Sequence, residues 1–222
     1  MIDVNSDSIN LNNEVHLTGR IEREPEYSHE VYGEKFLSFV LKVERLSDSS
    51  DYINVTVSER LIRDFDMTEG IPLEIEGQFR SYNNYTLTGS KLILTVFARD
   101  IKMVDEDNFS PQNNIYLNGF VCKEPVYRIT PFGREITDLL IAANRAYNKS
   151  DYMPCIAWGR NARFSGKLKV GENVKIWGRI QSREYQKRIS DDEVVTRTAF
   201  EISISKMEIV AEEGDMMETS IS

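Results

Sequence analysis

The chain carries one sequence pattern twice, and this internal repeat is the feature that most restricts its fold. Residues 13–60 align with residues 113–160 without a gap and share 12 identities in 48 positions. About three identities would be expected by chance at ordinary residue frequencies. A duplication explains the match. The 222 residues therefore divide into two units of about 100 residues each, a common domain size.

Within each copy, apolar and polar residues alternate, which is typical of β-strands. Residues 15–22, 37–44 and 52–58 show this alternation in the first copy. A short segment follows that ends at Gly70, or at Gly171 in the second copy, and it predicts a helix of two or three turns closed by a glycine cap. Two more strands joined by a hairpin complete each copy.

Five strands with one short helix between the third and fourth strands predict an all-β fold of two tandem OB-folds, which are five-stranded Greek-key barrels. Gly77 and Gly178 lie inside the fourth strands, where a barrel bends sharply. The predicted organisation is a disordered N-terminal arm at 1–12, OB-fold 1 at 13–105, a linker at 106–112, OB-fold 2 at 113–210 and a flexible acidic tail at 211–222.

Composition excludes several classes of protein. The N-terminus lacks the basic and apolar regions of a signal peptide, and no apolar run approaches the length of a membrane span. We therefore expect a cytoplasmic, nucleoid-associated protein without membrane contact. The two cysteines, Cys122 and Cys155, form no metal-binding pair, and no cofactor or metal is expected.

No residues suggest catalysis, so we expect no enzyme. The two histidines, His16 and His29, both fall in the first copy and have no counterpart in the second. Residues 159–168 superficially suggest a phosphate loop, but Asn161 and Leu168 stand where that motif needs Gly and Ser/Thr. No nucleophile lies beside a partner base in the sequence.

The second copy reads "NIYLNGFVCKEP", "LLIAANRAY", "DYMPCIAWGRNA" and "KVGENVKIWGRIQSREY" in that order. These segments are similar to the bacterial-type single-stranded DNA-binding proteins. The resemblance covers residues 113–210 closely and 13–104 more loosely. It implies sequence-tolerant binding and protection of single-stranded DNA in replication, recombination or repair. It also implies an assembly of four barrels, here a homodimer.

Four aromatic positions of that family's binding surface carry over to the second copy. They are Tyr147, Tyr152, Trp158 and Tyr185. The same positions of the first copy hold Ser47, Tyr52, Ser58 and Asn84, so three of the four aromatic rings are missing. Tyr52, Tyr82 and Tyr85 are secondary candidates for base stacking in the first copy.

The alternation of the third strand supports two of these positions independently of the family. If Met153, Cys155 and Ala157 face the barrel interior, then Tyr152, Pro154, Ile156 and Trp158 face outward. Such an apolar row in water favours a covering ligand, and stacked bases supply one, at about 1–3 kcal/mol each. The alternative is that Trp158 packs under the following helix as part of the core.

Charge separates the two copies in the same direction, although the whole chain has a net charge of −9. Residues 113–210 hold 16 Lys/Arg against 11 Asp/Glu, whereas residues 13–105 hold 11 against 17. Basic side chains near the aromatic positions predict phosphate contacts. The candidates are Arg145, Arg160, Arg179, Arg183, Lys187, Arg188 and Arg197.

Tyr116 and Phe120 lie on the outward side of the first strand of the second copy. The resemblance favours contact between barrels or subunits there. The family's usual acidic-hydrophobic tip is missing after the last strand, so the sequence gives no basis for partner recruitment by the tail.

Two other functions stay open at this point. One is an OB-fold protein-interaction or assembly scaffold with weak or no nucleic-acid binding. The other is binding of single-stranded RNA, because stacking and phosphate contacts do not read the 2′-hydroxyl group.

Overall fold

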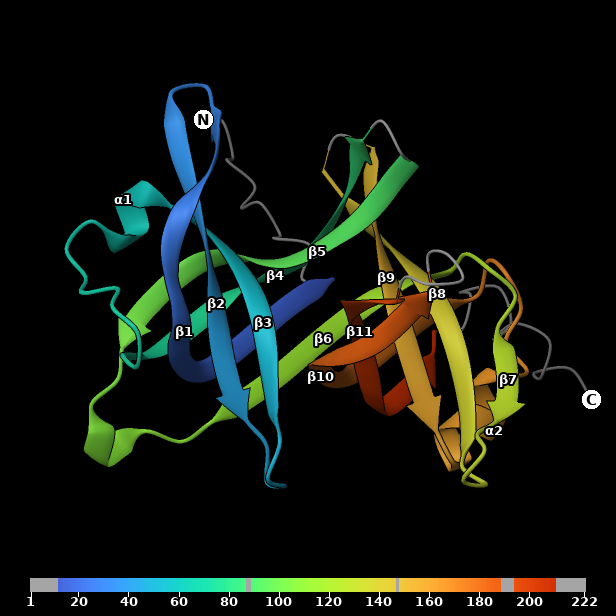
Figure 1. The fold of residues 1–222 in the computed structure, drawn as a ribbon. Coiled ribbons are helices and arrows are strands. Elements are labelled where there is room, and N and C mark those ends of the chain that lie inside the picture. Colours follow the sequence, from blue (N-terminus) through green and yellow to red (C-terminus); the bar gives the residue numbers. More distant parts are fainter. Residues whose placement is uncertain (1–11, 87–88, 147, 189–193, 211–222) are drawn as a thin grey trace, which may run out of the picture.

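The computed structural model describes residues 12–86, 89–146, 148–188 and 194–210 (Figure 1). Within these residues the first repeat forms β1 (Asn13–Val31), β2 (Glu34–Glu44), β3 (Ser50–Ser58), α1 (Glu59–Ile62), β4 (Pro72–Thr86) and β5 (Gly89–Met103). The second repeat forms β6 (Gln112–Val121), β7 (Val126–Ile129), β8 (Glu135–Arg145), β9 (Lys149–Trp158), α2 (Arg160–Ser165), β10 (Asn173–Arg188) and β11 (Val194–Ile209).

Each repeat closes into a barrel. In the first, the order β2-β3-β5-β4-β1 is closed by pairing of β1 with β2, and β3 runs parallel to β5. In the second, β8-β9-β11-β10-β6 is closed by pairing of β6 with β8, and β9 runs parallel to β11. This is the topology of the OB-fold. The predicted fold class is therefore confirmed.

The two barrels share one continuous sheet because β1 and β6 pair antiparallel, and in Figure 1 the barrels lie side by side around this contact. Asn13 lies opposite Leu117, and Leu17 lies opposite Asn113. The ladder is centred on the pair Val15–Ile115. Equivalent residues thus exchange places across the ladder, so an approximate twofold axis relates the two copies.

The copies differ in their first strands and their helices. β1 runs through 19 residues with register shifts around Pro25, whereas the second copy breaks between β6 and β7 around Pro125. Proline cannot donate to a ladder, so either a shift or a break is needed there. The helices α1 and α2 are only four and six residues long, shorter than predicted.

Two further local predictions need correction. Gly70 and Gly171 do have positive φ, but they lie in the turns before β4 and β10 rather than at helix ends. The linker predicted at 106–112 contains a 3₁₀ turn at Glu106–Asn108, and β6 already begins at Gln112. This turn packs on the first barrel: Arg20 donates two hydrogen bonds of 2.7 Å to Glu106 and covers the Phe109 ring at 4.2 Å.

The repeated residues build the two barrel interiors. Leu17 and Leu117 are fully buried in equivalent places, as are Ile53 and Met153 on the third strands. Over the described part of the chain, no helix is long and apolar enough to cross a membrane.

Gly77 and Gly178 occupy equivalent bulges, where the registers of β4 with β5 and of β10 with β11 shift by one residue. A Cβ atom at Gly178 would lie 2.3 Å from the backbone oxygen of Ser203, and one at Gly77 would lie equally close to that of Phe97. The bend therefore requires glycine, as predicted from the sequence.

We expect Gly178→Ala to lower the free energy of unfolding by about 1–3 kcal/mol, because the backbone of β11 must move to admit the methyl group. Urea titration followed by circular dichroism measures this loss. Gly133→Asn is the control. Gly133 has φ of 74° and open space around it, and asparagine tolerates that conformation. Equal losses in both variants would contradict this account of the bend.

Candidate nucleic-acid interface

The outward face of β9 carries exposed aromatic side chains. Tyr152 is 45% exposed and Trp158 is 38% exposed, while Met153, Cys155 and Ala157 are buried. The predicted alternation of β9 is therefore correct, and Trp158 is not a core residue. Ile156 differs from the prediction: it lies on the outward row but is only 4% exposed. The two rings are thus separate exposed platforms rather than the ends of one continuous apolar row.

Neighbouring elements hold these platforms in place. β8 pairs with β9 along its length, so Trp158 lies opposite the buried Ile136 and Tyr152 lies opposite Ala142. Directly after Trp158 the chain turns at Gly159, which has φ of 54° and donates its N–H to the Glu135 carbonyl at 2.9 Å. This turn keeps the Trp158 ring at the strand end, beside the start of α2.

The predicted basic residues divide into two groups. Arg160 is exposed next to Trp158, and Arg183 on β10 is 56% exposed with Glu201 3.7 Å away. Arg179 instead contacts the buried Asp51 of the first barrel at 2.9 Å, and Arg145 lies 3.7 Å from Asp151. Arg160 and Arg183 are therefore available on the surface, whereas Arg179 is committed to the contact between barrels.

Several predicted side chains lie outside the described part of the structure. These are Tyr147, Tyr185, Lys187, Arg188 and Arg197, and in the first barrel Tyr85. The backbone register is described for the hairpin of β10 and β11, where Tyr185 lies opposite Arg197 and Arg188 lies opposite Val194.

The first barrel presents a different surface at the equivalent positions. Tyr52 is 42% exposed and Tyr82 is 51% exposed. Ser58, which stands in the place of Trp158, is buried; it donates to Glu34 at 2.5 Å and accepts from the N–H of Arg60 at the start of α1. This position therefore caps a helix in one copy and exposes a ring in the other.

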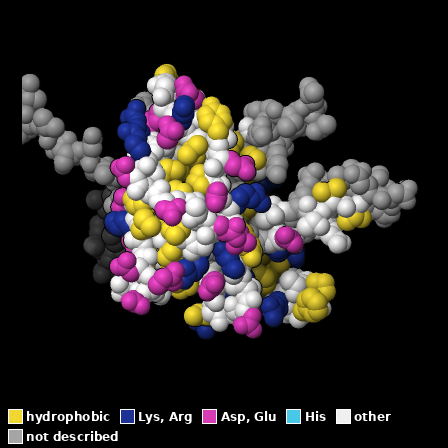
Figure 2. Space-filling model, turned by 60° about the vertical axis from the view of Figure 1, so that its left-hand side comes forward, with side chains coloured by type: hydrophobic (Ala, Val, Ile, Leu, Met, Phe, Trp, Pro, Cys, Tyr) yellow, Lys and Arg dark blue, Asp and Glu magenta, His cyan; other side chains and the backbone are white. Residues whose placement is uncertain are grey.

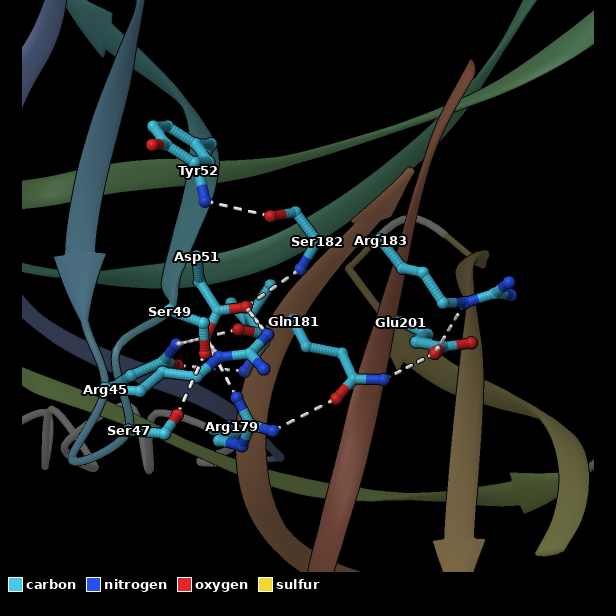
Figure 3. Close-up of polar contacts among 12 residues, drawn as sticks. Arg45, Ser47, Ser49, Asp51, Tyr52, Arg179, Gln181, Ser182, Arg183 and Glu201 are labelled. Carbon is cyan, nitrogen blue, oxygen red and sulfur yellow. Dashed lines mark hydrogen bonds and ion pairs between the residues drawn. The ribbon is translucent and has the colours of Figure 1, made fainter. Parts of the chain in front are cut away.

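A buried carboxylate joins the two barrels (Figure 3). Asp51 of β3 is 1% exposed and accepts hydrogen bonds from Arg45 of its own barrel and from Arg179 of the other. It also accepts from the backbone N–H of Ser182 at 3.1 Å, while the N–H of Tyr52 donates to the Ser182 hydroxyl at 2.9 Å. These bonds fix β3 against β10.

The approximate twofold axis repeats this contact on the other side. Asp151 is 1% exposed and accepts from Arg80 at 3.0 Å and from the backbone N–H of Ser81 at 2.9 Å. The N–H of Tyr152 donates to the Ser81 hydroxyl at 2.6 Å. Each stacking candidate on a third strand, Tyr52 or Tyr152, is therefore anchored through its backbone by the opposite barrel.

We call the contact between the barrels around Asp51 and Asp151 the seam. Sequence reasoning missed it, although a signal was present. Asp51 and Asp151 are identical in the two copies, yet the repeat alone does not say that they are buried. The arginines that bind them from the fourth strands, Arg80 and Arg179, are harder to find, because they occupy non-equivalent positions. Arg80 aligns with Gln181, and Arg179 aligns with Gln78.

The charge states of the seam follow from these contacts. Hydrogen bonding to Asp51 raises the pKa of Arg45 above its ordinary value. Burial lowers the pKa of Arg80, and the nearby charges of Arg145 and Arg99 lower it further, although Asp151 opposes both effects. Two other arginines therefore lie near Arg80 in addition to its partner Asp151.

Tyr116 and Phe120 lie on β6, where Phe120 is opposite Ala142, the residue of β8 that is also opposite Tyr152. The Tyr116 ring packs on Trp177 with centroids 5.3 Å apart, and Lys206 covers Trp177 at 4.5 Å. Tyr116 also lies opposite Glu14 in the ladder that joins the barrels. Phe120 is 41% exposed.

Among the residues that the structure describes, no group of three or more His, Cys, Asp or Glu side chains could hold a metal ion.

Fold and surface together define a tandem OB-fold protein. The model of the single-strand binding protein family matches residues 112–210. Single-stranded DNA-binding protein 2 of Listeria innocua is 31% identical over 97 residues, which cover 39% of this chain and 61% of that protein. Single-stranded DNA-binding protein A of Bacillus subtilis is 29% identical over 96 residues, which cover 40% of this chain and 56% of that protein.

The chain thus spans 56–61% of the length of these two relatives. The wild-type single-stranded DNA binding protein from Thermus aquaticus has a similar fold, with a TM-score of 0.73 at 20% identity over 90% of this chain and 93% of that one. The chain is a two-barrel protein whose residues 112–210 match the model of the single-strand binding protein family. The resemblance recognised in the sequence is confirmed.

We expect Asp51→Asn to destabilise the protein, because Arg45 and Arg179 lose their shared partner. Removing one member of a fully buried pair costs about 3–5 kcal/mol, and a loss nearer 2–3 kcal/mol is expected here because the arginines are partly exposed. Urea unfolding measures the change, and Asp48→Asn, at an exposed position of the same loop, is the control. If both variants were equally stable, the Asp51 carboxylate would make no contribution to the free energy of unfolding.

Proposed function

We propose that this protein binds single-stranded DNA with little sequence preference, mainly through the outward face of the second barrel. The observation that carries the proposal is the exposure of Trp158 and Tyr152 on one face of β9. Exposed aromatic rings on an OB-fold offer stacking platforms that every base can use. The names of the matched relatives, all single-stranded DNA-binding proteins, point to the same ligand.

Charge supports the second barrel as the main site. Its excess of basic residues suits a phosphate backbone; Arg160 is exposed two positions after Trp158, and Arg183 is exposed on β10. The side of the first barrel turned forward in Figure 2 carries acidic side chains scattered among basic and hydrophobic ones. A strand would therefore meet less repulsion on the second barrel. Participation in replication, recombination or repair follows as part of this proposal.

Replacing both platforms should separate this function from a scaffold role. Trp158→Ala with Tyr152→Ala should weaken binding of a poly-pyrimidine oligonucleotide by about 2–6 kcal/mol, from about 1–3 kcal/mol per stacked base. Titration at one fixed salt concentration measures the loss. Tyr52→Ala, at the equivalent position of the first barrel, is the matched control and should change affinity little. A double variant that bound like the wild type would exclude β9 as the stacking surface.

Tryptophan fluorescence gives an independent readout, because the chain has only Trp158 and Trp177. Trp158 should be quenched when a base stacks on it, whereas Trp177 packs on Tyr116 on another face. The quenching should therefore disappear in Trp158→Ala. An RNA oligonucleotide of the same sequence tests the preference between the two sugars in the same assay.

We also propose that two chains form a homodimer with four barrels. The supporting feature is a hollow of about 620 Å³ across the central strands β4-β1-β6-β10, centred on the approximate twofold axis. One half of its lining includes the charged side chains of Glu14, Glu76 and Arg99 together with His16, whereas the other half includes Tyr116 and Trp177. Two such hollows that faced each other across a twofold axis would form an isologous contact between two copies.

Trp177→Glu tests this assembly, because it places a charge in the uncharged half of the hollow. Light scattering of the wild type at micromolar concentration should give twice the chain mass of 25.6 kDa, and the variant should give the mass of one chain. Trp158→Glu is the control and should remain dimeric. A wild-type protein with the mass of one chain would exclude the proposed dimer.

A further inference from the structure

Two clefts flank the seam between the barrels, and they differ in charge although the twofold axis relates them. The first, which we name the arginine cleft, has a volume of about 420 Å³, and its charged lining is Arg80, Arg99, Arg145 and Asp151, a formal charge of +2. The second, the neutral cleft, measures about 540 Å³, and its charged lining is Arg45, Arg179, Asp51 and Glu44, a formal charge of zero.

The difference arises from two replacements between the copies. Arg99 on β5 aligns with Ser205 on β11, and Glu44 at the end of β2 aligns with Asn144 at the end of β8. The arginine cleft thus gains one positive charge and lacks one negative charge relative to its counterpart. This occurs beside the first barrel, which is acidic as a whole, so general composition does not explain it.

The positive charge of the arginine cleft is incompletely used inside the protein. Arg45 donates both Nε and Nη2 to Asp51, with Nε at 2.8 Å. Its counterpart Arg145 lies 3.7 Å from Asp151, whose oxygens accept instead from Arg80 and the Ser81 N–H. Nε of Arg145 is buried without a hydrogen-bond partner among the described residues. The Arg145 side chain is 33% exposed as a whole, so it borders the cleft with hydrogen-bonding capacity that the protein does not use.

A second hollow of about 290 Å³ shares Arg80 and Arg145 with the arginine cleft, and its lining also includes His29, Tyr82 and Phe97. These rings belong to an aromatic group on the outward face of the first barrel. His29 stacks on Phe36 with centroids 5.0 Å apart, and Phe36 lies 5.6 Å from Phe97. The two arginines therefore stand between a polar cleft that suits an anion and an aromatic hollow that suits a flat ring.

A third hollow continues in the same direction. It shares Thr56, Tyr82 and Thr95 with the aromatic hollow, measures about 210 Å³ and extends to Arg23, Glu26 and Asn54. The three hollows form a path from the seam across the first barrel. Cationic groups at one end and aromatic or amide groups along the way are the contacts that a nucleic-acid strand needs.

We propose that the arginine cleft binds a backbone phosphate of a single-stranded nucleic acid that crosses from the second barrel to the first, with a neighbouring base against Tyr82 and Phe97. Arginine forks suit phosphate oxygens because they donate two parallel hydrogen bonds. The proposal rests on the proposed function and extends it. The first barrel takes part through Arg80, Arg99 and aromatic residues at other positions than those of the second barrel.

The test compares salt dependence on oligonucleotides of two lengths. A strand of about 8 nucleotides can occupy one barrel, whereas one of about 35 can cross the seam, since one OB-fold covers roughly 4–16 nucleotides. Arg99→Gln with Arg145→Gln should reduce the slope of log affinity against log salt by about 0.7–1.4 for the long strand, at about 0.7 per phosphate. The slope for the short strand should not change in Arg99→Gln alone, because Arg99 lies on β5 of the first barrel.

Three variants control this experiment. Arg99→Lys with Arg145→Lys keeps the charge and should retain most of the slope. Arg45→Gln removes the equivalent arginine of the neutral cleft and should leave the long-strand slope unchanged. Arg99→Gln alone changes an exposed residue and should lose about 0.7 of slope, so the proposal stays testable if the double variant does not fold.

The outcomes separate this proposal from the proposed function. A wild type that bound neither strand would overturn the proposed function itself. A wild type that bound both strands, with the same long-strand slope in Arg99→Gln and Arg145→Gln, would overturn only the crossing at the seam. Melting temperatures with inorganic phosphate or poly-glutamate alone complete the test. These anions could stabilise the wild type but not the double variant Arg99→Gln with Arg145→Gln, while the long-strand slope is the same in both proteins. In that case the cleft would bind small anions or acidic peptides instead.

Discussion

The antiparallel pairing of β1 with β6 determines the arrangement of everything else in this protein. Each of these strands would otherwise leave unpaired backbone groups at an exposed edge. The ladder satisfies them and centres the approximate twofold axis on Val15 and Ile115. That axis brings β3 of the first barrel against β10 of the second, and β9 against β4. The buried carboxylates Asp51 and Asp151 then fix these contacts.

The barrel architecture could be predicted from the sequence because it depends on local patterns. Alternation along residues 15–22 and 52–58 gives strands, and glycine at 77 and 178 gives the bend, whatever the remote contacts are. The length of α1 could not be predicted in this way. The segment is long enough for two or three turns, but the structure has only one, Glu59–Ile62, with Ser58 capping its start.

The candidate site was predictable only where it follows from a single strand. Alternation within β9 correctly predicted that Tyr152 and Trp158 are exposed. It failed for Ile156, because the burial of an outward residue depends on neighbouring strands that periodicity does not reveal. The same limit applies to Arg179. It belongs to a basic strand in the sequence, but its charge is neutralised by Asp51, 128 positions away.

Duplication within one chain explains why the two halves of the seam can differ. In a dimer of identical chains, a substitution appears on both sides of the axis, so Arg99 would face both clefts or neither. In this chain the position of Arg99 holds Ser205 in the other copy. The pair Gln78 and Arg80 is likewise reversed as Arg179 and Gln181, yet each arginine still reaches a buried aspartate. The structure therefore retains the twofold contacts that stability requires, while the charge of each cleft is free to change separately.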